Sequence, residues 1–396
     1  MGGDAPRYDR GMSKDEFHEI AHSGGQVVLR VGRDKDGRRV YQQTWQHQRP
    51  VASGIFAIYA LAQGVPVCGL PLGGIGSPMP PPPFPGCYMV FIGSDSEGKY
   101  GHECPACKSY WRDQAGTNFC PNCGMQGEVQ DFLTAAQRSY VAQYCEKMRD
   151  ALAADADGDY VIDMDAVADA AGNAAQKPPF YYAEQSQQNK FECTACGGFN
   201  DILGIYGYCS RCRTRNDLQE LSQKIVPAIR ERINAGGPYE ACVRDAVAAF
   251  DSSVGRYVEQ LVHQVPLTQG RRNRLENRRF HNLAVVAGEL KEIFDIDILD
   301  GLKPEDVEFA KLMFHRRHVY EHKGGEADEK YIADSGDISV RPKQALHESQ
   351  ESAHRIAGLV LKMAGNLHRA FHEIIPPFAG PIEQYRKWNP KSVPSS

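Results

Sequence analysis

"CPACKSYWRDQAGTNFCPNC", residues 104–123, and "CTACGGFNDILGIYGYCSRC", residues 193–212, each hold two Cys-x-x-Cys pairs with twelve residues between the pairs. A tight Cys-x-x-Cys turn lets two sulfurs converge, and zinc prefers four tetrahedral ligands. We therefore predict two structural Zn²⁺ sites, each in a small hairpin module known as a zinc ribbon. The expected ligands are Cys104, Cys107, Cys120, Cys123, Cys193, Cys196, Cys209 and Cys212.

The two stretches also resemble each other, since "HECPAC" matches "FECTAC" and "NFCPNC" matches "GYCSRC". This similarity indicates an internal repeat of one module. A redox dithiol is the alternative for a single pair, but two matched pairs in each stretch argue against it. The other cysteines are isolated and are expected to be small buried apolar residues: Cys68, Cys87, Cys145 and Cys242.

The length of 396 residues suggests two or three domains. The formal net charge of −5 argues against a general affinity for nucleic acid, so a polyanion would have to meet a local basic patch. No stretch is apolar over the roughly 18 to 20 residues that cross a bilayer, and the N-terminus lacks the apolar core of a secretion signal. We therefore expect a cytoplasmic protein with no membrane partner.

The N-terminal part of the chain has the pattern of a β-hairpin. Residues 27–31 and 39–45 are rich in β-forming side chains, and Asp36-Gly37 between them suits a tight turn. We therefore expect a small β-containing module there. Prolines crowd residues 77–86 and predict a stiff polyproline connector.

Beyond residue 217 the pattern is almost wholly helical. Apolar residues recur every three or four positions in 243–261 and 356–374, which predicts amphipathic helices that share one core. Helices are also expected near 277–295 and over 304–321, where Pro304 suits a first helical position. The fold class is therefore multidomain and mainly α, with a helical bundle, two zinc ribbons and the β-containing module. The expected divisions are 1–76 (N-terminal module), 77–100 (proline-rich connector), 101–127 (first ribbon), 128–188 (helical and acidic connector), 189–216 (second ribbon), 217–376 (helical domain) and 377–396 (tail).

An acidic stretch between the ribbons, "DADGDYVIDMD" at residues 155–165, invites comparison with a calcium-binding loop. Tyr160 stands where such a loop needs glycine, and Ala166 stands where its bidentate glutamate belongs. We therefore predict a solvated acidic loop that ends in a helix cap.

The stretch "FHRRHVYEHKGG", residues 314–325, gathers two arginines and three histidines at the end of an expected helix. Arg317 and His322 are separated by four residues, and the polar His318 follows the arginine directly. With its helical context, this pattern resembles the R-x₄-H signature of the HEPN superfamily (higher eukaryotes and prokaryotes nucleotide-binding). The resemblance implies a HEPN-like bundle that forms a homodimer and acts as a metal-independent endoribonuclease. It also suggests a toxin or antiphage role, in which a neutralising or trigger-sensing protein partner would fit.

The implied chemistry suits these residue types. Cleavage of RNA through its own 2′-hydroxyl needs a group that exchanges a proton near neutral pH, as histidine does, and a cation that matches a phosphorane, as arginine does. The resemblance implies that Arg317 stabilises the scissile phosphate, that His322 is acid or base, and that His318 assists. Arg317 and His322 lie roughly 140° apart on an ideal helix, so an unwound helix end at Gly324-Gly325, or a two-fold partner, would have to complete the site.

Three alternatives stay open for this stretch. Arg316 with His322 fits the looser spacing that the family also tolerates, so Arg316 is either catalytic or a further RNA contact. His315, His318 and His322 have a spacing that could hold a metal on one helix face, although no HExxH pattern or nearby carboxylate supports this. The cluster also suits a solvated helix end, which favours cations.

Further arginines are concentrated in "QGRRNRLENRRF", residues 269–280. In an acidic protein this concentration predicts an RNA-backbone track, with a solvated basic face as the alternative. The expected RNA contacts are Arg271, Arg272, Arg274, Arg278 and Arg279. The arginines around the last cysteine pair, Arg211, Arg213 and Arg215, suit either a phosphate contact or a solvated loop.

These patterns together predict an endoribonuclease that needs no metal for catalysis. The principal alternative is a non-catalytic RNA- or protein-binding adaptor, which dimerises through the helical domain and recognises a partner with its ribbons. A zinc-ribbon regulator that binds DNA is a third alternative.

Overall fold

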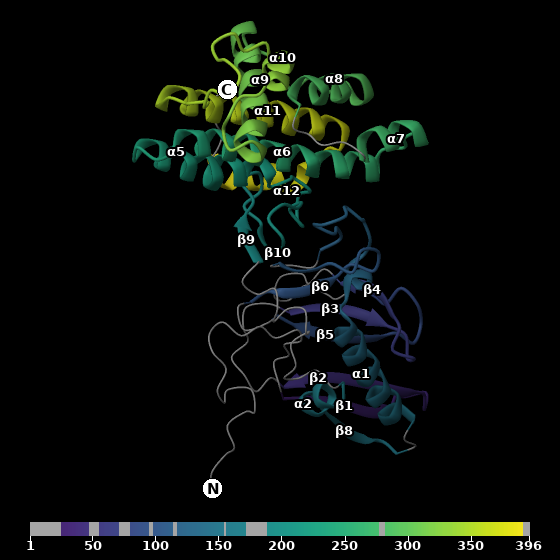
Figure 1. Ribbon diagram of the computed structural model, residues 1–396. Helices are drawn as coiled ribbons and strands as arrows, with labels where there is room; N and C mark the ends of the chain where they lie inside the picture. The colour runs from purple at the N-terminus through teal and green to yellow at the C-terminus, as the bar shows by residue number, and fades with distance from the viewer. Residues whose placement is uncertain are drawn as a thin grey trace. The chain divides into compact units, whose positions relative to one another are not determined.

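The computed structural model describes residues 25–46, 55–70, 80–94, 98–113, 117–153, 156–171, 188–276 and 282–390. The chain divides into two compact units (Figure 1). Unit 1 is Met1–Cys193 with Gly197–Gly204, and unit 2 is Thr194–Cys196 with Ile205–Ser396. Among the helices described, none is both long and apolar enough to cross a bilayer.

The first sheet of unit 1 is antiparallel and has the strand order β2-β1-β8. Strands β1 (Gln26–Arg33) and β2 (Arg39–Gln46) form the predicted hairpin, and Gly37 in its turn has a φ of 75°. Strand β8 (Gly158–Asp163) pairs with the other edge of β1.

Strand β8 corrects the acidic-loop prediction, because residues 158–163 of that stretch are extended and pair with β1. The residues between its aspartates explain this: Tyr160, Val161 and Ile162 favour strands, and Ile162 is buried in the core. The predicted helix cap is confirmed, since the Asp163 side chain accepts hydrogen bonds at the start of α2 (Met164–Ala170).

A second sheet of unit 1 has the order β4-β3-β5, with β3 (Ile55–Ala60), β4 (Pro66–Leu70) and β5 (Tyr88–Gly93). Helix α1 (Ala135–Ala153) and side chains from both sheets form one core, which includes Leu29, Ile58, Val90 and Tyr140. The expected connectors therefore have structural roles, since 77–100 supplies β5 and 128–188 supplies α1, β8 and α2.

The third sheet of unit 1 joins the hairpins of the two predicted ribbons. Strands β6 (Tyr100–Glu103) and β7 (Tyr110–Asp113) flank the first cysteine pair, and β9 (Gln188–Glu192) and β10 (Phe199–Leu203) flank the third. The order β6-β7-β10-β9 places the second strand of each hairpin against that of the other, antiparallel, with Arg112 opposite Asp201. The sequence predicts two separate ribbons, but their first hairpins share a sheet.

A buried ion pair holds this junction together. The Arg112 guanidinium donates to Asp201 Oδ2 from Nε at 2.9 Å and from Nη2 at 2.7 Å. Both side chains are almost inaccessible, at 3% and 0% exposure. Beside this pair, His102 Nε2 lies 3.0 Å from Asp113 Oδ1, and both residues are buried.

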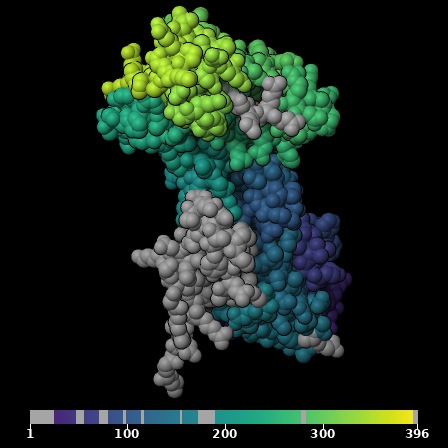
Figure 2. Space-filling view, viewed as in Figure 1, coloured from purple at the N-terminus to yellow at the C-terminus, as the bar shows by residue number. Residues whose placement is uncertain are grey.

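Unit 2 consists mainly of helices (Figure 1), and its atoms are coloured teal to yellow in Figure 2. Its longest helices are α6 (Tyr239–Gln264), α9 (Pro304–His322) and α11 (Gln350–Ile374). The expected helix near 277–295 is α8, which begins after Asn282, whose side chain accepts from the amide of Val285. The other helices are α4 (Asp217–Glu220), α5 (Val226–Asn234), α7 (Gln269–Glu276), α8 (Leu283–Phe294), α10 (Glu329–Ser335) and α12 (Ala379–Trp388), with a π-helical turn at Leu221–Ile225 between α4 and α5.

Helices α6, α9 and α11 share the core of unit 2. The predicted apolar stripes are buried, with Val247 and Val360 both at 0% exposure. Phe250 of α6 packs edge to face on Phe314 of α9 at 5.7 Å, and Tyr257 of α6 packs on Phe371 of α11 at 4.9 Å. Unit 2 therefore fixes the rotation of α9, the helix that carries the arginine and histidine motif.

We predict that Arg112→Ala destabilises the folded protein by about 3–5 kcal/mol, because Asp201 is left charged and buried without its partner. Arg30→Ala is the matched control, since Arg30 pairs with Asp159 on the surface of the same unit, at 68% and 48% exposure. Thermal unfolding followed by circular dichroism should show a clear fall in melting temperature for Arg112→Ala alone. Equal melting temperatures for the two variants would contradict this role.

Candidate functional site

Two groups of four cysteines have the geometry of metal centres. In each group the four sulfurs lie within 4.8 Å of one another. The Sγ atoms of Cys104 and Cys123 are 3.7 Å apart, and those of Cys196 and Cys209 are 3.6 Å apart. Zinc bound to four tetrahedral sulfurs at about 2.3 Å requires sulfur separations of about 3.8 Å. Both groups therefore fit a structural zinc ion.

The four Cys-x-x-Cys turns share one backbone geometry. In each turn, the amide after the second cysteine donates to the carbonyl of the first cysteine, at 2.7–3.1 Å. The amide of the first cysteine donates to the carbonyl two residues beyond the second, at 2.8–3.0 Å. The residue after the second cysteine always has a left-handed φ of 60–76°, at Lys108, Gly124, Gly197 and Arg213. The shared turn supports the internal repeat that the sequence predicts.

The residues that follow the last cysteine pair are built into unit 2. The Arg215 amide donates to His372 Nε2 at 3.2 Å, and His372 Nδ1 donates to the carbonyl of Ile375 at 3.0 Å. Burial lowers the pKa of His372 to about 4, so the ring is neutral and accepts at Nε2. The Arg215 side chain is buried against Asp217 at 2.7 Å. Arg215 is therefore a core residue, neither a phosphate contact nor part of a solvated loop.

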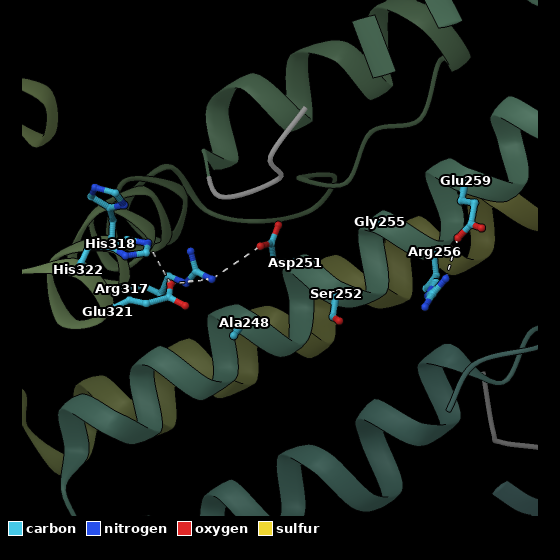
Figure 3. Close-up of a pocket in the computed structure, with 10 residues that line it drawn as sticks. All are labelled: Ala248, Asp251, Ser252, Gly255, Arg256, Glu259, Arg317, His318, Glu321 and His322. Atoms are coloured by element: carbon cyan, nitrogen blue, oxygen red, sulfur yellow. Dashed lines mark hydrogen bonds and ion pairs between the residues drawn. The ribbon is translucent and has the colours of Figure 1, made fainter. Parts of the chain in front are cut away.

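The motif helix α9 lines a cavity of about 610 Å³ together with α6 (Figure 3). We call this the motif cavity. From α9 it is lined by Arg317, His318, Glu321 and His322, and from α6 by Ala248, Asp251, Ser252, Gly255, Arg256 and Glu259. The small residues of α6 leave room in front of α9. The structure thus brings all three predicted catalytic residues to one hollow.

Arg317 is held between two carboxylates and keeps an unused donor. Its Nη2 lies 2.9 Å from Glu321 Oε2 and 3.9 Å from Asp251 Oδ2 of α6. The side chain is 13% exposed, and its Nε is buried without a hydrogen-bond partner among the described residues. A partly desolvated guanidinium with a spare donor is suited to binding an anion.

Two histidines stand beside this guanidinium. His322 Nε2 lies 3.7 Å from the same Glu321 oxygen that contacts Arg317, and its side chain is 53% exposed. The rings of His318 and His322 are 4.8 Å apart between centroids. Glu321 therefore lies between the arginine and His322. Sequence reasoning missed Glu321, although its position four residues after Arg317 is the spacing of a helical ion pair.

The motif helix does not unwind between its arginine and its last histidine. It remains helical through His322, and the amides of Lys323 and Gly325 both donate to the carbonyl of Val319, at 2.9 Å and 3.2 Å. Gly324 and Gly325 then take φ angles of 59° and 86°, which glycine adopts without strain. The expected unwinding therefore begins only after His322. The two side chains reach the cavity from different sides of one intact helix.

Arg316 has a different environment from Arg317. Its guanidinium contacts Asp337 at 2.9 Å and Glu348 at 3.0 Å, and its side chain is 12% exposed. Burial opposes the charged form, but these two carboxylates raise the pKa of Arg316 well above its ordinary value. Arg316 does not line the motif cavity. It fastens the segment after α10 to α9.

The two carboxylates that contact Arg316, those of Asp337 and Glu348, also accept hydrogen bonds from other side chains. Burial alone would raise the pKa of Asp337, but hydrogen bonds from Ser339, Tyr331 and Arg316 lower it to about 2. Tyr320 donates to Glu348 at 2.7 Å, and Glu348 is 1% exposed. This network accounts for Arg316 without any ligand.

Of the five arginines expected to contact the RNA backbone, the structure describes three, all on α7. Arg274 on α7 makes a two-point contact with Glu292 at 2.9 Å, and Arg272 lies 3.8 Å from Glu276. Arg271 is exposed. Arg278 and Arg279 lie outside the described residues.

No metal-binding group forms around the histidines of α9 in the described parts of the chain, where only the two cysteine clusters qualify. Comparisons with protein-family models, with curated proteins and with solved structures return no match for this chain. The chemistry of the motif cavity therefore has to follow from its own residues.

The cysteine geometry predicts two zinc ions per chain in the purified protein, measured by inductively coupled plasma mass spectrometry. Replacing Cys104 and Cys107 together with alanine should leave one zinc, because two ligands of the first cluster are lost. Cys242→Ala, which changes an isolated buried cysteine, should keep both. A wild-type protein without zinc, or a double variant that keeps two ions, would refute the assignment.

The contrasting environments of the two arginines predict different effects on stability. Arg316→Ala leaves two buried carboxylates unpaired and should cost about 3–5 kcal/mol of unfolding free energy. Arg317→Ala should cost markedly less, because Asp251 and Glu321 both reach solvent. Urea unfolding of the two variants gives the comparison. A larger loss for Arg317→Ala would show that its charge is structural.

Proposed function

We propose that this protein is a metal-independent endoribonuclease of the HEPN type, in which two copies of unit 2 meet at their motif cavities. The observation that carries the proposal is the surroundings of Arg317: a desolvated cation with a spare donor, next to two imidazoles on one hollow surface. The helical surroundings of the motif support the proposal, since α6, α8 and α11 all pack against α9. The two zinc clusters have a structural role in this proposal.

The proposed reaction uses the RNA's own 2′-hydroxyl as nucleophile. One imidazole takes the hydroxyl proton as the oxygen attacks the adjacent phosphorus, and Arg317 stabilises the charge that develops on the phosphorane. A second imidazole protonates the 5′-oxygen that leaves. The products are a 2′,3′-cyclic phosphate and a free 5′-hydroxyl. His322 is the principal acid or base, and His318 assists it.

A second copy supplies what one helix lacks. In a single chain, Arg317 and His322 reach the cavity from different sides of α9, and Glu321 lies between them. A phosphate can bind Arg317 only by breaking the ion pair between Arg317 and Glu321, which costs free energy. Further positive charge near the phosphate would offset that cost. The arginine and histidines of a two-fold partner provide this charge and the second proton carrier.

Substrate contact beyond the cavity is proposed to come from Arg271, an exposed arginine of α7. Arg274 already has carboxylate partners and serves mainly to fix α7 against α8. A toxin or antiphage role, with a neutralising or trigger-sensing partner, follows from the superfamily resemblance and extends the proposal.

The direct test incubates purified protein with RNA in the presence of EDTA. The wild type should cleave it to fragments with 2′,3′-cyclic phosphate ends, and Arg317→Ala and His322→Ala should each reduce the rate by about 100-fold or more. Arg369→Ala and His354→Ala are matched controls on α11, where both residues lie outside the motif cavity. These controls should retain wild-type rates.

The other outcomes identify the rivals. RNA that is bound at low salt but left intact would favour the non-catalytic adaptor. Cleavage that requires an added divalent metal would restore the histidine metal site. Salt-sensitive binding of duplex DNA that disappears in a Cys209→Ala, Cys212→Ala variant would favour a DNA-binding regulator.

A further inference from the structure

A second cavity, of about 280 Å³, adjoins α9 and α10 in unit 2. Phe314, His315 and Val319 contribute to it from α9, and Tyr331 and Asp334 contribute from α10. We call it the side cavity. His318 lines both the side cavity and the motif cavity. The two cavities therefore have His318 as a common lining residue.

Three of the residues that line the side cavity are buried. Phe314 and Val319 are each 1% exposed, and Tyr331 is 5% exposed. The Tyr331 hydroxyl donates to Asp337 at 2.6 Å, so its polar end is already used. The other lining residues are polar, so the cavity offers hydrogen-bonding groups around a small apolar patch: Asn282, His315, His318, Lys323, Asp328, Lys330 and Asp334.

Three polar side chains that line the side cavity remain available to a ligand: His315, Asp334 and Lys330. His315 has no hydrogen-bond partner among the described residues, and the charge of Asp334 acts on it. Burial lowers the pKa of His315, which favours a neutral ring with one donor and one acceptor. Lys323 is paired with Asp328 at 3.2 Å, whereas Lys330 makes no ion pair within the described parts of the chain.

We infer that the side cavity binds the nucleobase next to the phosphate that enters the motif cavity, and that guanine is the base it fits best. The inference rests on the proposed function. Guanine presents two adjacent N–H donors, which one carboxylate such as Asp334 can accept together. Its O6 and N7 acceptors suit a cation such as Lys330. Adenine and the pyrimidines lack this combination of donors and acceptors.

The first test maps cleavage sites on an RNA of mixed sequence. The wild type should cut next to guanine at least tenfold faster than next to the other bases. Lys330→Ala and Asp334→Ala should each reduce that preference by about tenfold, because each removes a group that is proposed to contact the base. Glu373→Ala, an exposed carboxylate on α11, should keep the preference. Cleavage without base preference, or an unchanged preference in both variants, would overturn the inference and leave the nuclease proposal intact.

The second test does not depend on cleavage. Isothermal titration calorimetry should show that guanosine 3′-monophosphate binds the wild type at least tenfold more tightly than cytidine 3′-monophosphate, and that Asp334→Ala removes the difference. Guanine-selective binding by a protein that leaves RNA intact would support the side cavity and refute the nuclease. Equal affinity for the two nucleotides would refute the base assignment.

Discussion

The rest of the site depends on two neighbouring arginines of one helix, of which one makes structural ion pairs and the other faces the motif cavity. Successive residues of an α-helix point about 100° apart, so Arg316 and Arg317 cannot face the same surroundings. Arg316 meets Asp337 and Glu348 and fixes the polar network behind α9. With that side occupied, and with Phe314 packed on Phe250 of α6, the helix has one rotation available. That rotation presents Arg317 to the motif cavity together with His318 and His322.

In unit 1 a comparable constraint acts on the sheet that the first hairpins of the two predicted ribbons share. The first hairpins of the two ribbons pair through β7 and β10, and the pair Arg112–Asp201 is buried where they meet. Such a pair adds little net stability over apolar residues, but breaking it leaves an uncompensated charge, so it specifies one register. The cysteine turns are closed four-sulfur sites with identical hydrogen bonds. Their geometry suits a scaffold better than a catalytic metal, which would need an open coordination position.

Local patterns in the sequence predicted local structure well. The cysteine spacing identified both four-sulfur groups, the turn at Asp36-Gly37 identified the first hairpin, and the apolar stripes identified α6 and α11. The predictions that were wrong or missing concern contacts between residues that are distant in the chain. The strand β8 exists because β1 offers it an edge, and the shared sheet exists because two repeats meet. Likewise, Asp251 carries no signal in the sequence, because only the packing of α6 against α9 brings it towards Arg317.

The central claim is that a phosphate of RNA occupies the motif cavity and replaces a carboxylate on Arg317. A crystal structure of the protein with an RNA whose 2′-hydroxyls are replaced by hydrogen, so that attack on phosphorus is impossible, tests this claim most directly. We expect a backbone phosphate within hydrogen-bond distance of Arg317 and between histidines of two copies, with Glu321 displaced. An RNA that lies elsewhere while Arg317 keeps Glu321, or two copies whose motif cavities face apart, would contradict it.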